Sequence, residues 1–279
     1  MKNEGKKDIS IKNVSKLLKF LDKHTNLNDP EQVKWFIAQH QVSTGSKRNL
    51  TIAYERYTKY HKIEWEKPKY TDEAKPIRIP TKERLAKLIA GAGRTLSVKL
   101  QISMETGLRP VELCNLKTKD VDTQQRIIYP TTAKYGASRQ LRISQNLAER
   151  LNDYIHREHR QLEEQLFSGN SANYGKLYRK MRNRLAKRCP TLKNIRLYDF
   201  RHYFATNLYD KTKDILLVKQ QMGHKKLDTT LIYTQLLNLN EDEWTCKGAT
   251  NVEEAEQLIE AGFQYVTEME GTKLFRKRK

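Results

Sequence analysis

The sequence predicts a mainly α-helical protein with a small antiparallel β-sheet, an α+β chain of two domains and a short tail. Apolar residues recur at helical spacing through residues 9–65 and again from residue 81 onward. Two segments rich in Ile, Tyr and Thr flank Tyr135-Gly136-Ala137 and predict a β-hairpin. Residues 66–80 hold three of the seven prolines and have no apolar period, so they predict a linker.

These patterns predict a helical domain over residues 1–67, a linker over 68–80, a second domain over 81–237 and a small α/β tail over 238–279. The tail is expected to be an appendage of the ββα type, with the order strand, helix, strand, strand. Asn251 would cap its helix and Gly262 would end it. About 40 residues are marginal for independent folding. We therefore expect the tail to pack on the second domain or on a neighbouring subunit.

The charge balance points to a polyanionic partner. Lysine and arginine number 53 against 33 aspartate and glutamate residues, a formal charge of +20. A chain this basic repels itself unless it meets a polyanion, and nucleic acid is the expected one. Charge alone leaves open a generally basic protein without a specific site.

Several other classes of protein are not expected. No run approaches 18 apolar residues, so no membrane span is predicted, and the first residues lack the apolar region of a secretory signal. The three cysteines are scattered, which suits a reducing, cytoplasmic setting and argues against a disulfide framework or a zinc site. We expect no metal site and no cofactor.

Five short motifs carry residues suited to phosphodiester chemistry. Breaking this ester without a metal needs a nucleophile, a proton acceptor, a proton donor and cations around the phosphate oxygens. Arginine binds phosphate bidentately and stays charged. The motifs are TGLRPVEL with Arg109, the hairpin with Lys134, LYDFRHYFAT with Arg201 and His202, MGHKKLDTT with His224, and TTLIYTQL with Tyr233.

In order and spacing these motifs resemble the tyrosine recombinase (phage integrase) family over roughly residues 81–237, and look most like archaeal Xer- or integrase-type members. The resemblance implies a helical, SAM-like core-binding domain before a catalytic domain. It implies that Arg109 and Arg201 clamp the scissile phosphate, while Lys134 protonates the leaving 5′ oxygen. His224 would hydrogen-bond a non-bridging oxygen. Tyr233 would attack to form a 3′-phosphotyrosyl bond, with neither ATP nor a metal.

Two further positions refine this expectation. Glu112 follows Arg109 by three residues and would orient it. The family usually has histidine three residues before its second arginine, where this chain has Tyr198. A phenol has a reference pKa near 10 and is a poor base near neutrality, although it can donate a hydrogen bond. Three acceptors are then possible for the proton that Tyr233 loses when it attacks: water, a phosphate oxygen, or His202 if its ring faces the site.

The resemblance also implies how the protein meets DNA. The expected partner is double-stranded DNA at a specific site, held between the two domains. Separately from the resemblance, Tyr alternates with Lys and Arg after residue 46, which suits a helix lying against a phosphate backbone or an ordinary amphipathic helix with Tyr in its core. We expect DNA contacts from Lys47, Arg48, Tyr54 and Arg139. Strand exchange would need a tetramer on two duplexes, formed from free monomers or dimers.

Two other functions compete with site-specific recombination. One is DNA relaxation of the type IB topoisomerase kind, and the other is site-specific DNA binding without catalysis. The target sequence, and the choice between integration, excision and dimer resolution, are not predicted.

Overall fold

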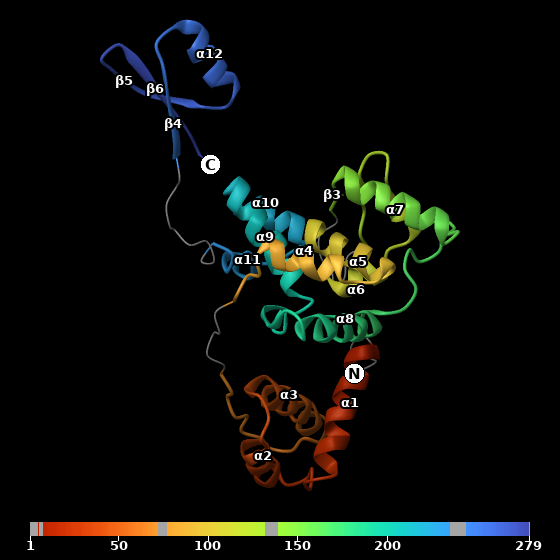
Figure 1. The fold of residues 1–279 in the computed structure, drawn as a ribbon. Coiled ribbons are helices and arrows are strands. Elements are labelled where there is room, and N and C mark those ends of the chain that lie inside the picture. The colour runs from red at the N-terminus through yellow and green to blue at the C-terminus, as the bar shows by residue number, and fades with distance from the viewer. Residues whose placement is uncertain (1–4, 6–7, 72–76, 132–138, 235–243, 279) are drawn as a thin grey trace. The chain divides into compact units, whose positions relative to one another are not determined.

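The computed structural model describes residues 5, 8–71, 77–131, 139–234 and 244–278 (Figure 1). In this part of the chain most residues are helical, and the strands form two three-stranded antiparallel sheets. The predicted α+β class is confirmed. By contact the chain divides into two compact units, Met1–Pro76 and Ile77–Lys279.

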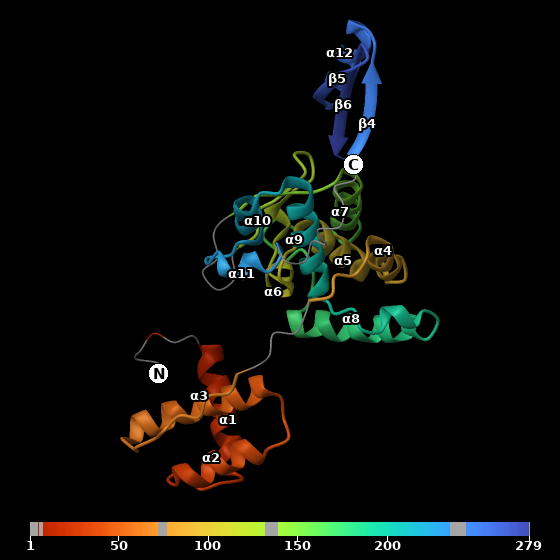
Figure 2. The ribbon, with the colours of Figure 1, turned by 90° about the vertical axis from the view of Figure 1, so that its left-hand side faces the viewer.

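The first unit is built from α1 (Asp8–Asp22), α2 (Pro30–Gln39) and α3 (Thr44–His61) (Figure 2). Asp29 caps α2 by accepting a hydrogen bond from the backbone of Gln32, and Pro30 occupies the first turn, where no partner for its nitrogen is needed. Ser43 caps α3 in the same way. The buried apolar core joins all three helices through Leu21, Val33, Ile37, Leu50 and Tyr54.

Part of the predicted linker belongs to this unit. Tyr70 of the linker packs against its core, as Trp65 of the predicted domain does. Nε and Nη2 of Arg48 each donate to the backbone oxygen of Tyr70 at 3.1 Å. The chain therefore stays attached to the helices beyond residue 67, where the sequence placed the end of the first domain.

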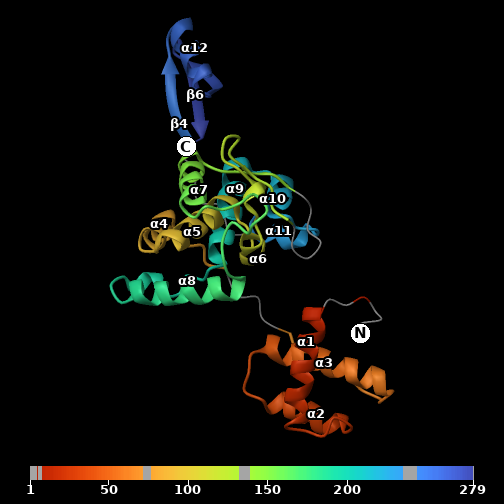
Figure 3. The same ribbon diagram turned by 90° about the vertical axis from the view of Figure 1, so that its right-hand side faces the viewer.

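The second unit is organised around α5 (Arg94–Thr106), which contacts five other helices (Figures 1 and 3). Leu100 and Ile102 on α5 are fully buried. The contacting helices are α4 (Lys82–Ala90), α6 (Pro110–Cys114), α7 (Gln145–Arg157), α8 (Ser171–Ala186) and α9 (Asp199–Thr212). The helices α10 (Ile215–Met222) and α11 (Asp228–Leu231) follow. Two short 3-10 turns cover Thr118–Asp120 and Pro190–Leu192.

A small sheet lies beside these helices. Its strands are β1 (Val121–Asp122), β2 (Ile127–Ile128) and β3 (Leu141–Arg142), in the order β1-β2-β3. Ile128 lies opposite Leu141, and both are buried, which fixes the register of the hairpin. The predicted hairpin pairing is confirmed. Its turn, with Lys134, lies outside the described residues.

The tail has the predicted order of elements. It consists of β4 (Trp244–Ala249), α12 (Val252–Glu260), β5 (Gln264–Met269) and β6 (Thr272–Arg278), with strand order β4-β6-β5. The side chain of Asn251 accepts from the backbone of Glu254, and Gly262 has a φ of 82°, so the helix begins and ends as expected. Ala249, Ala255, Leu258 and Phe275 form its small core.

No helix in the described residues is long and apolar enough to cross a membrane.

Candidate active site

Four segments of the second unit line one open pocket of about 380 Å³. Residues 223–226 and 229–233 are neighbours in sequence, and the other two segments are distant from them; each segment contributes a residue that the motifs singled out. The lining residues are Arg109, Tyr198, His202, Gly223, His224, Lys225, Lys226, Thr229, Ile232 and Tyr233. Five of the seven described candidates for catalysis or its support thus share one cavity; the other two, Arg201 and Glu112, hydrogen-bond to His224 and Arg109 of its lining.

Arg109 enters the pocket from the junction of α5 and α6. Gly107 ends α5 with a φ of 61°, and an added Cβ there would lie 2.4 Å from the ring of Phe204, so only glycine suits this turn. Pro110 then starts α6. Glu112 binds Arg109 twice: Oε2 accepts from its backbone nitrogen at 3.0 Å and Oε1 from Nη1 at 2.7 Å. The guanidinium is thereby held while its side chain stays 23% exposed.

Glu112 is completely buried and is shared by a second arginine, Arg139. Nη2 of Arg139 donates to Oε2 of Glu112 at 2.8 Å, and neither side chain is exposed. Burial alone would raise the pKa of Glu112. The charges of Arg139 and Arg109, with their hydrogen bonds, outweigh burial and hold this pKa below its ordinary value. The carboxylate therefore stays ionised and fixes both arginines.

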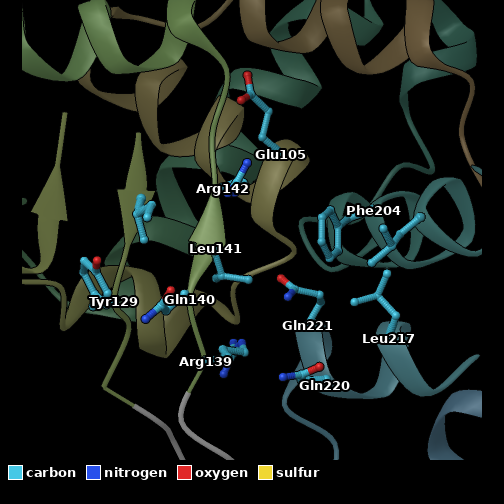
Figure 4. A pocket seen from close by; sticks show the side chains of 12 residues that line it. Glu105, Tyr129, Arg139, Gln140, Leu141, Arg142, Phe204, Leu217, Gln220 and Gln221 are labelled. Atoms are coloured by element: carbon cyan, nitrogen blue, oxygen red, sulfur yellow. The ribbon is translucent and has the colours of Figure 1, made fainter. Parts of the chain in front are cut away.

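The prediction that Arg139 contacts DNA is wrong, because its side chain is enclosed by protein. Arg139 lines a different pocket of about 710 Å³, between β3 and the helices α9 and α10, together with Phe204, Leu217 and Gln221 (Figure 4). On its other side, Nη1 would lie 2.6 Å from a Cβ added at Gly223. Glycine at 223 thus lets the chain before His224 approach the buried guanidinium.

Arg201 lies on α9 and is 1% exposed. Its guanidinium spans two turns of the chain: Nη1 donates to the backbone oxygen of Gly107, and Nη2 donates to that of Met222 at 2.6 Å. Burial, helped by the charge of Arg109, lowers the pKa of Arg201 to about 10. The group remains a cation at neutral pH, and its Nε has no hydrogen-bond partner among the described residues.

His224 follows Gly223, which ends α10 with a φ of 61°. Nη2 of Arg201 lies 3.1 Å from Nε2 of His224, and Nδ1 of His224 lies 2.9 Å from Oγ1 of Thr230. Since a guanidinium only donates, Nε2 accepts and Nδ1–H donates to Thr230. Burial and the neighbouring arginines lower the pKa of His224 to about 4, which agrees with this neutral form.

Tyr233 is 2% exposed and packs with Ala205, Val218 and Met222. Its hydroxyl lies 3.2 Å from Nδ1 of His202. Burial raises the pKa of Tyr233 to about 12, although the charge of Arg201 acts in the opposite direction. Tyr233, which the sequence predicts as the nucleophile, therefore lies at the pocket as a neutral phenol within hydrogen-bond reach of His202.

Tyr198, at the start of α9, is 42% exposed. Its ring meets the ring of His202 edge-on, with the centroids 5.1 Å apart. The position where the family usually has histidine thus faces the pocket, but within the described residues its recorded partner is His202 and not Tyr233.

The predicted DNA contacts of the first unit differ in exposure. Nζ of Lys47 donates to the backbone oxygen of Ala38 at 2.6 Å; Lys47 is half-buried, and Arg48 is exposed. The prediction that Tyr54 contacts DNA is wrong: its side chain has no exposed surface, and its hydroxyl donates to the backbone oxygen of Leu27. Tyr54 is a core residue because it continues the apolar stripe of α3.

Comparison with known proteins identifies the family of this site. Residues 81–239 match the model of the phage integrase family. The tyrosine recombinase XerA of Pyrococcus furiosus is 26% identical over 249 residues, which cover 84% of this chain and 85% of that protein. A probable integrase/recombinase protein of Methanocaldococcus jannaschii is 30% identical over 161 residues, 53% of this chain and 49% of that protein.

Solved structures share the fold. The crystal structure of XerA recombinase aligns with a TM-score of 0.52 at 23% identity, over 95% of this chain and 96% of that one. The Tn1549 transposon integrase in complex with transposon right end DNA aligns with a TM-score of 0.67 at 15% identity, over 92% and 95% of the two chains. The family match covers residues 81–239, more than half of the present chain. The chain therefore belongs to the phage integrase family of tyrosine recombinases, enzymes that act on DNA.

Proposed function

We propose that this chain is a site-specific DNA recombinase that cuts and rejoins strands through a 3′-phosphotyrosyl bond on Tyr233. One observation carries the proposal: Arg109, His224 and Tyr233 from separate motifs line one open pocket, and Arg201 hydrogen-bonds to His224 in its wall. A phosphodiester entering it would meet the exposed side of Arg109 and the buried cation of Arg201. Such a pair stabilises the charge that develops on the phosphate oxygens during attack.

The state of His224 suggests how the site responds to DNA. Without a phosphate, Nε2 of His224 accepts a hydrogen bond from Arg201. A phosphate would add negative charge beside the ring and raise the pKa of His224, because an opposite charge favours the cationic form. Nε2 would then carry a proton and donate to a non-bridging oxygen, as the family resemblance implies. Binding of DNA should therefore be accompanied by proton uptake.

The remaining chemistry needs no external energy. The phosphotyrosyl ester conserves the energy of the broken phosphodiester, so a 5′ hydroxyl can reverse the step without ATP. We assign protonation of the leaving 5′ oxygen to Lys134, and the orientation of Arg109 to Glu112. Metal- and ATP-independence are thus part of the proposal.

We also propose how the DNA is held. Lys47 and Arg48 of the first unit and the basic helix α8 of the second would contact the phosphate backbone. Lys176, Lys180 and Arg184 are surface cations of α8, whose buried side is formed by Tyr174, Tyr178 and Met181. Exchange between two duplexes would require four protomers.

A nicked suicide duplex tests the proposal. Its cleavage releases a short fragment that diffuses away, so any covalent protein–DNA product accumulates and survives denaturation. The wild-type protein should form this adduct without added metal or ATP and in the presence of a chelator, whereas Tyr233→Phe should bind the same DNA and form none. Absence of a wild-type adduct on DNA that it binds specifically would leave a non-catalytic DNA-binding protein.

A second pair of assays separates recombination from relaxation. Recombination predicts strand exchange between two duplexes that each carry the selected site, and little relaxation of a supercoiled plasmid that lacks it. Relaxation of the site-free plasmid without exchange would favour the topoisomerase-like activity.

A further inference from the structure

The hydroxyl of Tyr233 must lose a proton when it attacks phosphorus, and the proposed function leaves the acceptor unassigned. The hydroxyl lies 3.2 Å from Nδ1 of His202, within hydrogen-bond reach. No other hydrogen bond to this oxygen is recorded in the described part of the chain. We infer that Nδ1 of His202 accepts the proton of Tyr233 in the cleavage step proposed above, on which this inference rests.

The surroundings of His202 suit a neutral acceptor. The residue is 9% exposed, and its ring lies between those of Tyr198 and Tyr233, at centroid distances of 5.1 and 5.9 Å. Burial lowers the pKa of His202 below its ordinary value; Asp199 opposes this shift, while Arg196 and Arg201 add to it. A neutral imidazole has one nitrogen that accepts. With its proton on Nε2, the ring presents Nδ1 to the phenol, which can only be the donor in that pair.

The other candidate side chains are less suited. Both ring nitrogens of His224 are already engaged, Nε2 with Arg201 and Nδ1 with Thr230. Tyr198 contacts the edge of His202, and a phenol with a reference pKa near 10 does not take up a proton near neutrality. His202 therefore supplies the function that the family usually gives to the position held by Tyr198, from four residues further along the same helix.

His202 is also held in place independently of the nucleophile. Its neighbour in sequence, Arg201, is bonded to the backbone of Gly107 and of Met222. This fixes the turn of α9 that carries the imidazole. The ring can therefore stay beside the phosphate-binding arginines while Tyr233, now buried, moves toward its target.

The proposed step is balanced within the site. The O–H bond of Tyr233 breaks and its proton passes to Nδ1 of His202. The phenolic oxygen forms a bond to phosphorus, the bond from phosphorus to the 5′ oxygen breaks, and that oxygen takes a proton from the acid assigned to Lys134. In the rejoining step the 5′ hydroxyl attacks, and the imidazolium of His202 returns its proton to the departing tyrosine oxygen.

The test is the pH dependence of single-turnover adduct formation on the nicked suicide duplex, between about pH 5 and 9. The key variant is His202→Asn, because its amide oxygen can still accept a hydrogen bond near the position of Nδ1 but cannot take a proton. His156→Asn on the exposed face of α7 is the matched control. Tyr198→Phe tests the competing acceptor.

The wild-type rate should be level above about pH 6.5, the ordinary histidine pKa, and fall below the lowered pKa of His202 as the ring becomes protonated. His202→Asn should be slower by about 10²-fold near neutrality, a typical loss for a general base. Its rate should rise about tenfold per pH unit as hydroxide replaces the missing acceptor, so the defect shrinks with pH. His156→Asn should match the wild type, and Tyr198→Phe should keep the shape of the wild-type profile.

Other outcomes have separate meanings. A His202→Asn defect that is equal at every pH would reduce His202 to a positioning residue and overturn the inference. A tenfold rise per pH unit in Tyr198→Phe instead would make Tyr198 the acceptor. If His202→Asn does not fold, the wild-type profile decides, since a rate that climbs tenfold per unit through pH 7 excludes a histidine acceptor. Failure of the wild type to form any adduct would overturn the proposed function first.

Discussion

Two carboxylates of this chain each bridge two cationic side chains, at similar distances but in different surroundings. Glu112 binds Arg109 at 2.7 Å and Arg139 at 2.8 Å, and its side chain is fully buried. Glu163 binds Lys117 at 3.0 Å and Lys119 at 2.8 Å, and its side chain is 69% exposed. Water replaces the partners of an exposed carboxylate at little free-energy cost, whereas a buried one that loses its charge leaves its cations uncompensated. Distances alone would rank the two bridges as equals.

The two bridges also differ in their position relative to the candidate site. The bridge at Glu163 joins the loop that follows α7 to Lys117 and Lys119 at the 3-10 turn Thr118–Asp120, and none of these three residues lines the candidate pocket. The bridge at Glu112 joins the first arginine of the site to Arg139, which lies just before strand β3. Loss of the Glu112 bridge should therefore lower the stability of the second unit and also disturb the geometry of phosphate binding.

The largest expected difference is in the melting temperatures of variants that remove the charge of Glu112 or of Glu163. Glu112→Gln should destabilise the folded protein by about 3–5 kcal/mol, because two arginines lose a buried counter-charge. For a unit of this size that lowers the melting temperature by roughly 10 °C. Glu163→Gln should leave the melting temperature unchanged. Differential scanning calorimetry of the two variants beside the wild type makes the measurement, and equal melting temperatures for both variants would contradict the distinction.

Acidification should remove the stability difference between the wild type and Glu112→Gln. Its pKa is lower in the folded than in the unfolded protein, so its contribution to stability is fully present above the unfolded pKa of about 4.3 and is lost as pH falls through the folded value. The gap in melting temperature between wild type and Glu112→Gln should be constant from pH 7 to about pH 5 and narrow below about pH 4. A gap that widens on acidification would mean that the sign of the shift is wrong.

Substitution of Arg139 should affect cleavage more than DNA binding. Arg139→Met removes one partner of Glu112, and the resulting freedom of Arg109 should slow adduct formation by about 10²-fold, as small misplacements in active sites do. The slope of log affinity against log salt should stay as in the wild type, because the buried side chain meets no phosphate. Lys47→Gln is the contrast: it should reduce that slope by about 1 and leave the cleavage rate at saturating DNA unchanged.

If Arg139→Met reduces the slope of log affinity against log salt, the DNA contact of Arg139 predicted from the sequence would be supported. A slope unaffected by Lys47→Gln would remove Lys47 from the predicted contacts of the first unit.

The smallest expected effect is the uptake of a proton when DNA binds. Binding of duplex DNA near pH 7 should be accompanied by uptake of up to about one proton, because phosphate raises the pKa of His224 from about 4. Calorimetric titrations in buffers of different ionisation enthalpy measure this number, and His224→Gln should lower it. An equal uptake by wild type and His224→Gln would show that His224 stays neutral on DNA.

Local patterns predicted much of this molecule. The cap at Asn251, the apolar stripes and the two paired strands of the hairpin each depend on neighbours in sequence, and these elements formed as expected. The motifs around Arg109, Arg201, His224 and Tyr233 were recognisable for the same reason, because each is a short run with its own chemistry.

Side-chain direction was harder to predict, since it depends on packing between distant segments. Arg139 follows a polar turn and its sequence context suits a surface cation; only Glu112, 27 residues earlier, explains why it is buried. Tyr54 alternates with basic residues that suggest a DNA-facing helix, yet it lies on the apolar side of α3. The approach of His202 to Tyr233 depends on how α9 is rotated, although spacings of three and four residues do place Tyr198, Arg201, His202 and Ala205 on one side of that helix.

The central claim is that Tyr233 itself carries the broken DNA strand. Proteolysis of the denatured adduct, nuclease trimming and mass spectrometry of the modified peptide test it most directly. The account predicts a nucleotide linked through a 3′ phosphate to the peptide that contains Tyr233, and no modified peptide from Tyr233→Phe. A nucleotide on Tyr198 or on any other residue, or an adduct that persists in Tyr233→Phe, would contradict it.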